Sequence, residues 1–123
     1  MSSPSTHSSY HWIADNHQLA SLCEQLQSTT SLAIDTEFMR TNTYFPKLAL
    51  IQLSDGEQCW LIDVLAIDQF APLKALLESP QRTLIFHAPA EDFEVLDHVL
   101  SIVPSNIFDT QLAAGLVNIG YSM

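Results

Sequence analysis

Glycine, cysteine and basic residues are all scarce in this 123-residue sequence, and each scarcity argues against a class of protein. Glycine occurs three times, at Gly56, Gly115 and Gly120. Neither the glycine-rich fingerprint of dinucleotide-binding proteins nor the phosphate-binding loop of nucleotide hydrolases can be formed from this spacing. The Gly-x-Ser-x-Gly motif is also missing, so a hydrolase with a nucleophile elbow is not indicated.

The two cysteines, Cys23 and Cys59, stand apart, because neither has a second cysteine three residues away. This count argues against a zinc site. Cys23 falls in a helical pattern and Cys59 in a strand pattern. We therefore expect both to be buried, reduced thiols of a cytoplasmic protein.

Only four lysines and arginines, Arg40, Lys47, Lys74 and Arg82, oppose fourteen acidic residues, and the formal net charge is −10. Taken alone, this balance argues against nucleic-acid binding, because phosphate contacts usually draw on many basic side chains. Bound divalent cations would offset part of the local negative charge. A basic segment outside this sequence would offset more of it.

Long apolar runs are also missing: none approaches the roughly 18 residues of a membrane-spanning helix. The first nine residues are polar and lack the basic and apolar regions of a secretory signal, so we expect 1–9 to be a flexible tail. The remaining residues, 10–123, are enough for one domain with its own core. The sequence is 47% hydrophobic and 15% charged, which is typical of a globular protein.

Hydrophobic spacing predicts that this domain is α/β. In the first half we expect a helix capped by Asp15, and strands at 10–13, 32–38, 48–53 and 58–64. The last three strands suit an antiparallel meander. In the second half helices and strands alternate, at 70–77, 83–86, 90–100, 107–108 and 110–117. Such alternation favours parallel crossovers, and the prediction is a mixed sheet with helices on its faces.

One predicted strand, 32–38, carries two acids in its second half. Asp35 and Glu37 share one face of this strand, because side chains two residues apart point the same way. If that face is buried, the carboxylates need a partner, a proton or a metal, and Mg²⁺ and Mn²⁺ prefer such hard oxygen ligands. The alternative is that the strand has simply reached solvent at Asp35. The pair alone does not separate the two interpretations.

A third acid, Asp92, lies in the predicted helix 90–100. At 100° per residue it falls in the middle of an apolar face formed by Phe93, Val95, Leu96, Val99 and Leu100. The other polar residues fall on the opposite side, at Glu91, Glu94, Asp97 and His98. A helix cap would explain Asp92, but metal ligation explains it together with Asp35 and Glu37, and we favour that hypothesis. Three such acids would hold a pair of divalent ions about 4 Å apart.

Three groups of residues match a known family. The first is Ile34-Asp35-Thr36-Glu37-Phe38, followed by Arg40, Thr43, Tyr44, Pro46 and Leu50-Ile51-Gln52-Leu53. The second comprises His87, Ala88, Glu91, Asp92, Val95 and Leu96. The third is Asp109-Thr110-Gln111-Leu112-Ala113-Ala114. Together they resemble the exonuclease domain of ribonuclease D, and the similarity runs from about Tyr10 to the last residue.

The resemblance implies a ribonuclease H-like fold and a DEDD-type 3′–5′ exonuclease. Such an enzyme trims RNA 3′ ends, for example those of tRNA precursors, and releases 5′-mononucleotides. Asp35, Glu37 and Asp92 match three of the family's four acidic ligands for two Mg²⁺ or Mn²⁺ ions. One ion would activate the attacking water, and the other would stabilise the leaving 3′ oxygen. Thr36 and Phe38 are expected to line the pocket of the 3′-terminal nucleotide.

Three further residues near the predicted site have two interpretations each. Arg40 and Tyr44 suit phosphate contact and base stacking, or they belong to an ordinary connection between two strands. His87 lies near the substrate, or it is a buried structural histidine.

The sequence departs from the family at two places. Ala88-Pro89-Ala90 replaces the family's Ala-Gly-Ser, and proline is compatible with the start of a helix. The third motif, Tyr-x-x-x-Asp, which supplies the fourth ligand, does not occur in these residues. We therefore expect the chain to be the N-terminal part of an exonuclease domain, inactive or nearly so. The alternatives are a DNA exonuclease of proofreading type and a non-catalytic domain that binds nucleic acid or protein.

Overall fold

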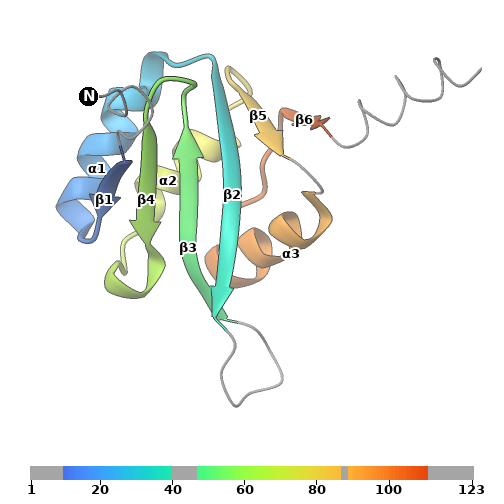
Figure 1. Cartoon of the computed structure of the whole chain (residues 1–123). Coiled ribbons are helices and arrows are strands. Elements are labelled where there is room, and N and C mark those ends of the chain that lie inside the picture. The colour runs from blue at the N-terminus through green and yellow to red at the C-terminus, as the bar shows by residue number, and fades with distance from the viewer. Residues whose placement is uncertain (1–9, 40–46, 87–88, 111–123) are drawn as a thin grey trace, which may run out of the picture.

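The computed structural model describes residues 10–39, 47–86 and 89–110, with their side chains except at Met39 and 89–93. The predicted tail 1–9, the connection 40–46, His87 and the predicted helix from residue 111 onward lie outside this description. Within the described residues, a single sheet is backed by helices (Figure 1).

Six strands of the described part form the sheet, in the order β1-β4-β3-β2-β5-β6. They are β1 (Tyr10–Ile13), β2 (Ser31–Met39), β3 (Lys47–Ser54), β4 (Cys59–Asp63), β5 (Thr83–Phe86) and β6 (Ile107–Asp109). Strands β2, β3 and β4 form the predicted antiparallel meander. The contacts of β1 with β4, of β5 with β2 and of β6 with β5 are all parallel. The predicted mixed sheet is confirmed.

The described helices also follow the prediction. They are α1 (Asn16–Gln25), α2 (Ala71–Glu78) and α3 (Pro89–Leu100), with single 3₁₀ turns at Leu26–Ser28 and Val64–Ala66. Asp15 caps α1 as predicted, because its Oδ1 accepts a 2.7 Å hydrogen bond from the backbone N–H of Gln18. No helix among these is long and apolar enough to cross a membrane.

The hydrophobic core lies between one face of the sheet and the helices α1 and α2, which run behind the strands in Figure 1. Ile34, Ile51 and Ile62, from the three central strands, point into it and are at most 5% exposed. The opposite face of β1, β4, β3 and β2 is covered by no described helix (Figure 1). The described helices thus leave one face of these four strands open, and the predicted mixed sheet flanked by helices is confirmed.

We call this second surface the open face. Strand register and alternation assign to it one residue in two along each strand. Its members in the four strands include Trp12, Ala33, Asp35, Glu37, Leu50, Gln52, Leu61 and Asp63. All eight are exposed or half-buried, whereas the strand residues between them are mostly buried.

Two predicted burials are wrong. Val99 was expected on the apolar face of α3 but is 49% exposed, whereas Leu96 is fully buried. The two lie about 60° apart around the helix, so the stripe that contacts the core is narrower than the apolar pattern. Cys59 is half-buried because it lies on β4 opposite Tyr10 of the edge strand β1, which is itself exposed. Cys23 is buried as predicted, and both thiols are free.

Arg82 is a buried cation that joins two helix ends. Its side chain is 1% exposed and donates hydrogen bonds only to backbone carbonyls. These carbonyls belong to Leu26, Gln27, Thr29 and Leu76, at distances of 2.8 to 3.4 Å. They lie at or near the C-terminal ends of α1 with its 3₁₀ extension and of α2, where a positive charge is favoured.

Candidate metal centre

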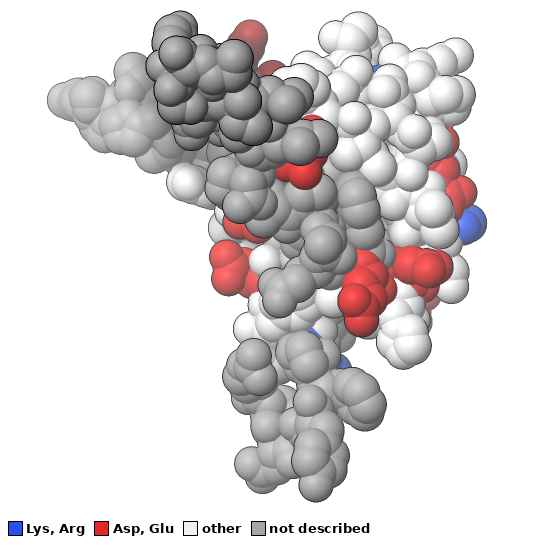
Figure 2. Space-filling model, turned by 90° about the vertical axis from the view of Figure 1, so that its right-hand side faces the viewer, with Lys and Arg blue, Asp and Glu red and all other residues white. Residues whose placement is uncertain are grey.

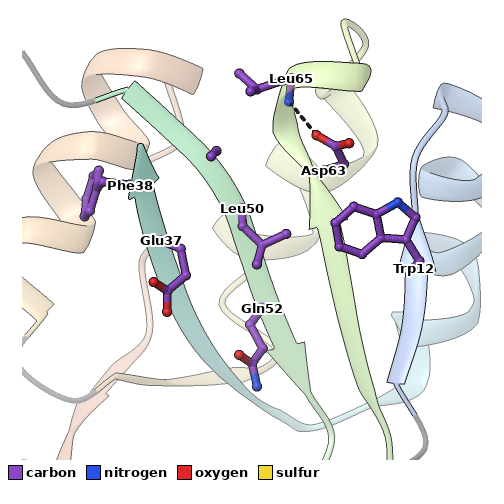
Figure 3. Close-up of a pocket in the computed structure, with 8 residues that line it drawn as sticks. Trp12, Glu37, Phe38, Leu50, Gln52, Asp63 and Leu65 are labelled. Carbon is purple, nitrogen blue, oxygen red and sulfur yellow. Dashed lines mark hydrogen bonds between the residues drawn. The ribbon is translucent and has the colours of Figure 1, made fainter. Parts of the chain in front are cut away.

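The second half of β2 extends beyond its pairing with β5. The pairing of β2 with β5 ends at Ala33 opposite Ile85, so from Ile34 onward β2 pairs only with β3 among the described strands. Helix α3, which follows β5 in the chain, lies beside the C-terminal end of β2 in both Figure 1 and Figure 3. This arrangement brings the element that carries Asp92 next to the strand that carries the two other predicted ligands.

Asp35 and Glu37 lie together on the open face of β2 and are both exposed. Asp35 Oδ1 accepts a 3.0 Å hydrogen bond from the backbone N–H of Thr36. Neither carboxylate forms an ion pair with a lysine or arginine of the described residues. The premise that this face is buried is therefore wrong here, because the described helices cover the other face. The two carboxylates nevertheless offer hard oxygen atoms on one side of one strand, which fits a divalent cation.

Glu37 also lines a hollow of about 640 Å³ on the open face (Figure 3). Its walls come from four strands or the residues next to them: Trp12, Glu37, Phe38, Ala49, Leu50, Gln52, Asp63 and Leu65. Asp63 Oδ1 accepts a 3.1 Å hydrogen bond from the backbone N–H of Leu65, the dashed line in Figure 3. The hollow thus combines two carboxylates and one amide with aromatic and aliphatic side chains.

Three residues of this hollow, Trp12, Gln52 and Asp63, are not among the predicted site residues, although Gln52 belongs to the first motif that matches the family. Each lies on a different strand, and only the register of the sheet brings them together. The available signal was the alternation of β3 and β4, which places Gln52 and Asp63 on the face opposite Ile51 and Ile62. That signal does not say which face stays open.

The two predicted pocket residues next to the acids lie differently. Thr36 is 7% exposed and points to the core side, so its side chain is on the opposite face from both carboxylates. Phe38 is half-buried, packs against the core and lines the hollow beside Glu37. A bulge lies between Glu37 and Phe38: Glu37 pairs with Leu50 and Phe38 with Leu48, so Ala49 of β3 is skipped.

The other predicted site residues are only partly described. Asp92 lies in the first turn of α3, where the backbone is described and the side chain is not. Arg40, Tyr44 and His87 lie outside the described residues. Among the side chains that are described, no three of His, Cys, Asp and Glu are grouped to hold a metal ion. The ligand set of Asp35, Glu37 and Asp92 stays a prediction.

Negative charge dominates the side of the molecule next to α3. Figure 2 shows several acidic patches on this side and only small areas of lysine or arginine. The residues that line the hollow include no lysine, arginine or histidine. Lys74 is engaged elsewhere, in a 2.8 Å ion pair with Glu78, and Arg82 is buried. Lys47, the exposed lysine at the start of β3, does not line the hollow. The described site therefore attracts cations more readily than phosphate.

Comparison with known proteins identifies the protein family to which this chain belongs. A profile of the 3′–5′ exonuclease family matches residues 10–123, which is nearly the whole chain. The chain therefore belongs to the 3′–5′ exonuclease family.

Within that family it is similar to ribonuclease D, as the motifs predicted. It is 48% identical to ribonuclease D of Escherichia coli K12 over 105 residues, which cover 85% of this chain and 28% of the relative. It is 41% identical to ribonuclease D of Pseudomonas paraeruginosa over 112 residues, which cover 91% of this chain and 30% of that relative. The chain thus spans less than a third of the length of these relatives.

Solved structures confirm the ribonuclease H-like fold. The crystal structure of Escherichia coli RNase D, described as an exoribonuclease involved in structured RNA processing, matches with a TM-score of 0.80. That match has 48% identity and covers 85% of this chain and 28% of the other. Trypanosoma brucei RNase D in complex with RNA U12 matches with a TM-score of 0.71 at 23% identity, over 83% of this chain and 37% of the other.

Proposed function

We propose that the protein is a metal-dependent 3′–5′ exoribonuclease of the ribonuclease D type, which trims the 3′ ends of RNAs such as tRNA precursors in the cytoplasm. One observation carries the proposal: Asp35 and Glu37 share the open face of β2, beside the helix that carries Asp92. The 48% identity to ribonuclease D of Escherichia coli K12 over 105 residues supports it.

The proposed cofactor is Mg²⁺ or Mn²⁺, with two ions in the complete site. Asp35, Glu37 and Asp92 would hold them, because carboxylate oxygens are the ligands that these ions prefer. When bound, the ions would supply positive charge for the attacking and leaving oxygens of an in-line displacement. Their positive charge would also offset the negative charge of the protein surface, which otherwise repels RNA.

The chain's own residues would place the end of the RNA. Phe38 borders both Glu37 and the hollow, so its ring is available to the 3′-terminal nucleotide. Arg40 and Tyr44, which follow it in the chain, would contact a phosphate and stack on a base. His87 would lie near the substrate at the end of β5. Because the Tyr-x-x-x-Asp motif does not occur in the 123 residues, we expect these residues alone to be inactive or nearly so.

Two other functions make different predictions. A DNA exonuclease of proofreading type would use the same acids, and only a comparison of substrates separates it from a ribonuclease. A non-catalytic binding domain would not need Asp35, Glu37 and Asp92 together, and their joint presence argues against it.

The decisive assay uses the full-length product of the gene, on 5′-labelled RNA and DNA with Mg²⁺, Mn²⁺ or a chelator. We expect stepwise shortening of RNA from its 3′ end that the chelator abolishes. Asp35→Ala and Asp92→Ala should each reduce the rate to that of the chelated sample, because each removes a proposed ligand.

The matched control is Asp97→Asn, an exposed acid of the same helix α3, which should retain the wild-type rate. If Asp35→Ala or Asp92→Ala leaves the rate near wild type, the ligand assignment is wrong. Faster shortening of DNA than of RNA would favour the proofreading type instead.

A further inference from the structure

Gln52 of β3 lies directly opposite Asp35 of β2 in the antiparallel ladder. Directly opposed side chains point to the same face, with Cβ atoms about 4.5 to 5.5 Å apart. That separation lies within the span of a glutamine side chain. Gln52 is half-buried, and its amide makes no hydrogen bond with any described residue.

The surroundings of this amide are rich in acceptors and poor in donors. Asp35 lies across the ladder, and Glu37 and Asp63 line the same hollow as Gln52 (Figure 3). Among the side chains that line the hollow, only Gln52 and Trp12 carry an N–H group. An amide left without a partner amid three carboxylates is poised to donate to one of them.

The register selects Asp35 as the acceptor. One oxygen of its carboxylate, Oδ1, already accepts from the backbone N–H of Thr36, and the other accepts no hydrogen bond from the described residues. A second donor at that other oxygen would fix the plane of the carboxylate. Partners of this kind orient the groups that bind a metal and raise its affinity.

An amide is suited to this task because it carries no charge. A lysine or arginine at position 52 would neutralise Asp35 and compete with a cation for it, whereas a leucine would leave the carboxylate free to rotate. We propose that Gln52 is a positioning residue, whose amide N–H donates to Asp35 and holds this carboxylate in the orientation that binds a divalent cation. The inference rests on the proposed function and adds a residue to that site.

The first test measures Mn²⁺ affinity of the 123-residue chain by calorimetry. Gln52→Leu should weaken binding by about 10- to 100-fold, the range typical of such partners. Gln52→Asn keeps the amide on a side chain that is one methylene group shorter, and it should recover part of the lost Mn²⁺ affinity. Gln81→Leu, the same change at an exposed residue far from the site, should bind as the wild type does. Thermal unfolding of all variants checks that the fold is retained.

The second test needs no metal. The side-chain amide resonances of Gln52 should shift when Asp35→Asn is introduced and stay in place with Asp63→Asn. Unmoved resonances in Asp35→Asn would overturn the inference, as would wild-type Mn²⁺ affinity in Gln52→Leu. If the wild-type chain binds no Mn²⁺, the metal assignment fails for this chain, and the amide shifts alone then decide whether Gln52 contacts Asp35.

Discussion

Burial sets the chemistry of the single residue Cys23. Its side chain is 2% exposed, in the core near the buried guanidinium of Arg82. Burial raises the pKa of the Cys23 thiol from its ordinary value of 9.0 to about 12, and the charge of Arg82 offsets only part of this shift. The thiol is therefore a small apolar side chain of the core at neutral pH and not a nucleophile.

This shift predicts a specific loss of stability at high pH. Above about pH 9 the unfolded thiol releases its proton, whereas the folded thiol keeps its proton until about pH 12. The unfolded state then binds fewer protons, so the free energy of unfolding decreases as pH rises through this window. Urea unfolding between pH 8 and pH 11 should show a steeper decrease for the wild type than for Cys23→Ala. Parallel decreases in the two proteins would contradict the assigned pKa.

At the scale of elements, Arg82 stabilises the packing of α1 against α2. Its guanidinium donates 2.8 Å hydrogen bonds to the backbone carbonyls of Gln27 and Leu76. These carbonyls lie near the C-terminal ends of two elements that are about 50 residues apart in the chain. No carboxylate of the described residues pairs with it, so the carbonyl groups and the helix dipoles supply its compensation.

Replacing Arg82 should therefore be costly. Arg82→Met leaves several carbonyls without a donor, and we expect the free energy of unfolding to fall by about 3 kcal/mol or more. Arg82→Lys should recover only part of this, because an ammonium group cannot reproduce the fork of the guanidinium. Lys74→Met breaks the exposed ion pair with Glu78 and the hydrogen bond to the Ser101 carbonyl, and it should lower this free energy far less because solvent screens both interactions. Equal losses in Arg82→Met and Lys74→Met, measured by urea unfolding, would refute this role.

Element positions were predictable because their signals are local. The cap at Asp15 and the strands β1 and β5 appear where short patterns of capping and alternating residues place them. The open face was not predictable in the same way. Alternation divides β2 into two faces, but it does not say which face the helices cover. For the same reason the sequence leaves open whether Asp35 and Glu37 are buried or reach solvent, and the structure shows that both are exposed.

At the scale of the whole molecule, the candidate site combines residues that the sequence predicts with residues that it does not predict. Asp35, Glu37 and Asp92 were selected because acids stood within apolar patterns, a signal that the sequence contains. Gln52 and Trp12 reach the hollow through β3 and β1, and their proximity follows from the strand order. A sequence read one segment at a time does not contain that order.

At the scale of the whole molecule, the net charge of −10 and the acidic site favour the binding of cations, on which the proposed function depends. The most direct measurement is a crystal structure of the chain soaked in Mn²⁺, with anomalous scattering to locate the metal. We predict Mn²⁺ in direct contact with carboxylate oxygens of Asp35, Glu37 and Asp92. Ordered side chains of these three acids that point apart into solvent, with Mn²⁺ bound elsewhere or not at all, would contradict the account.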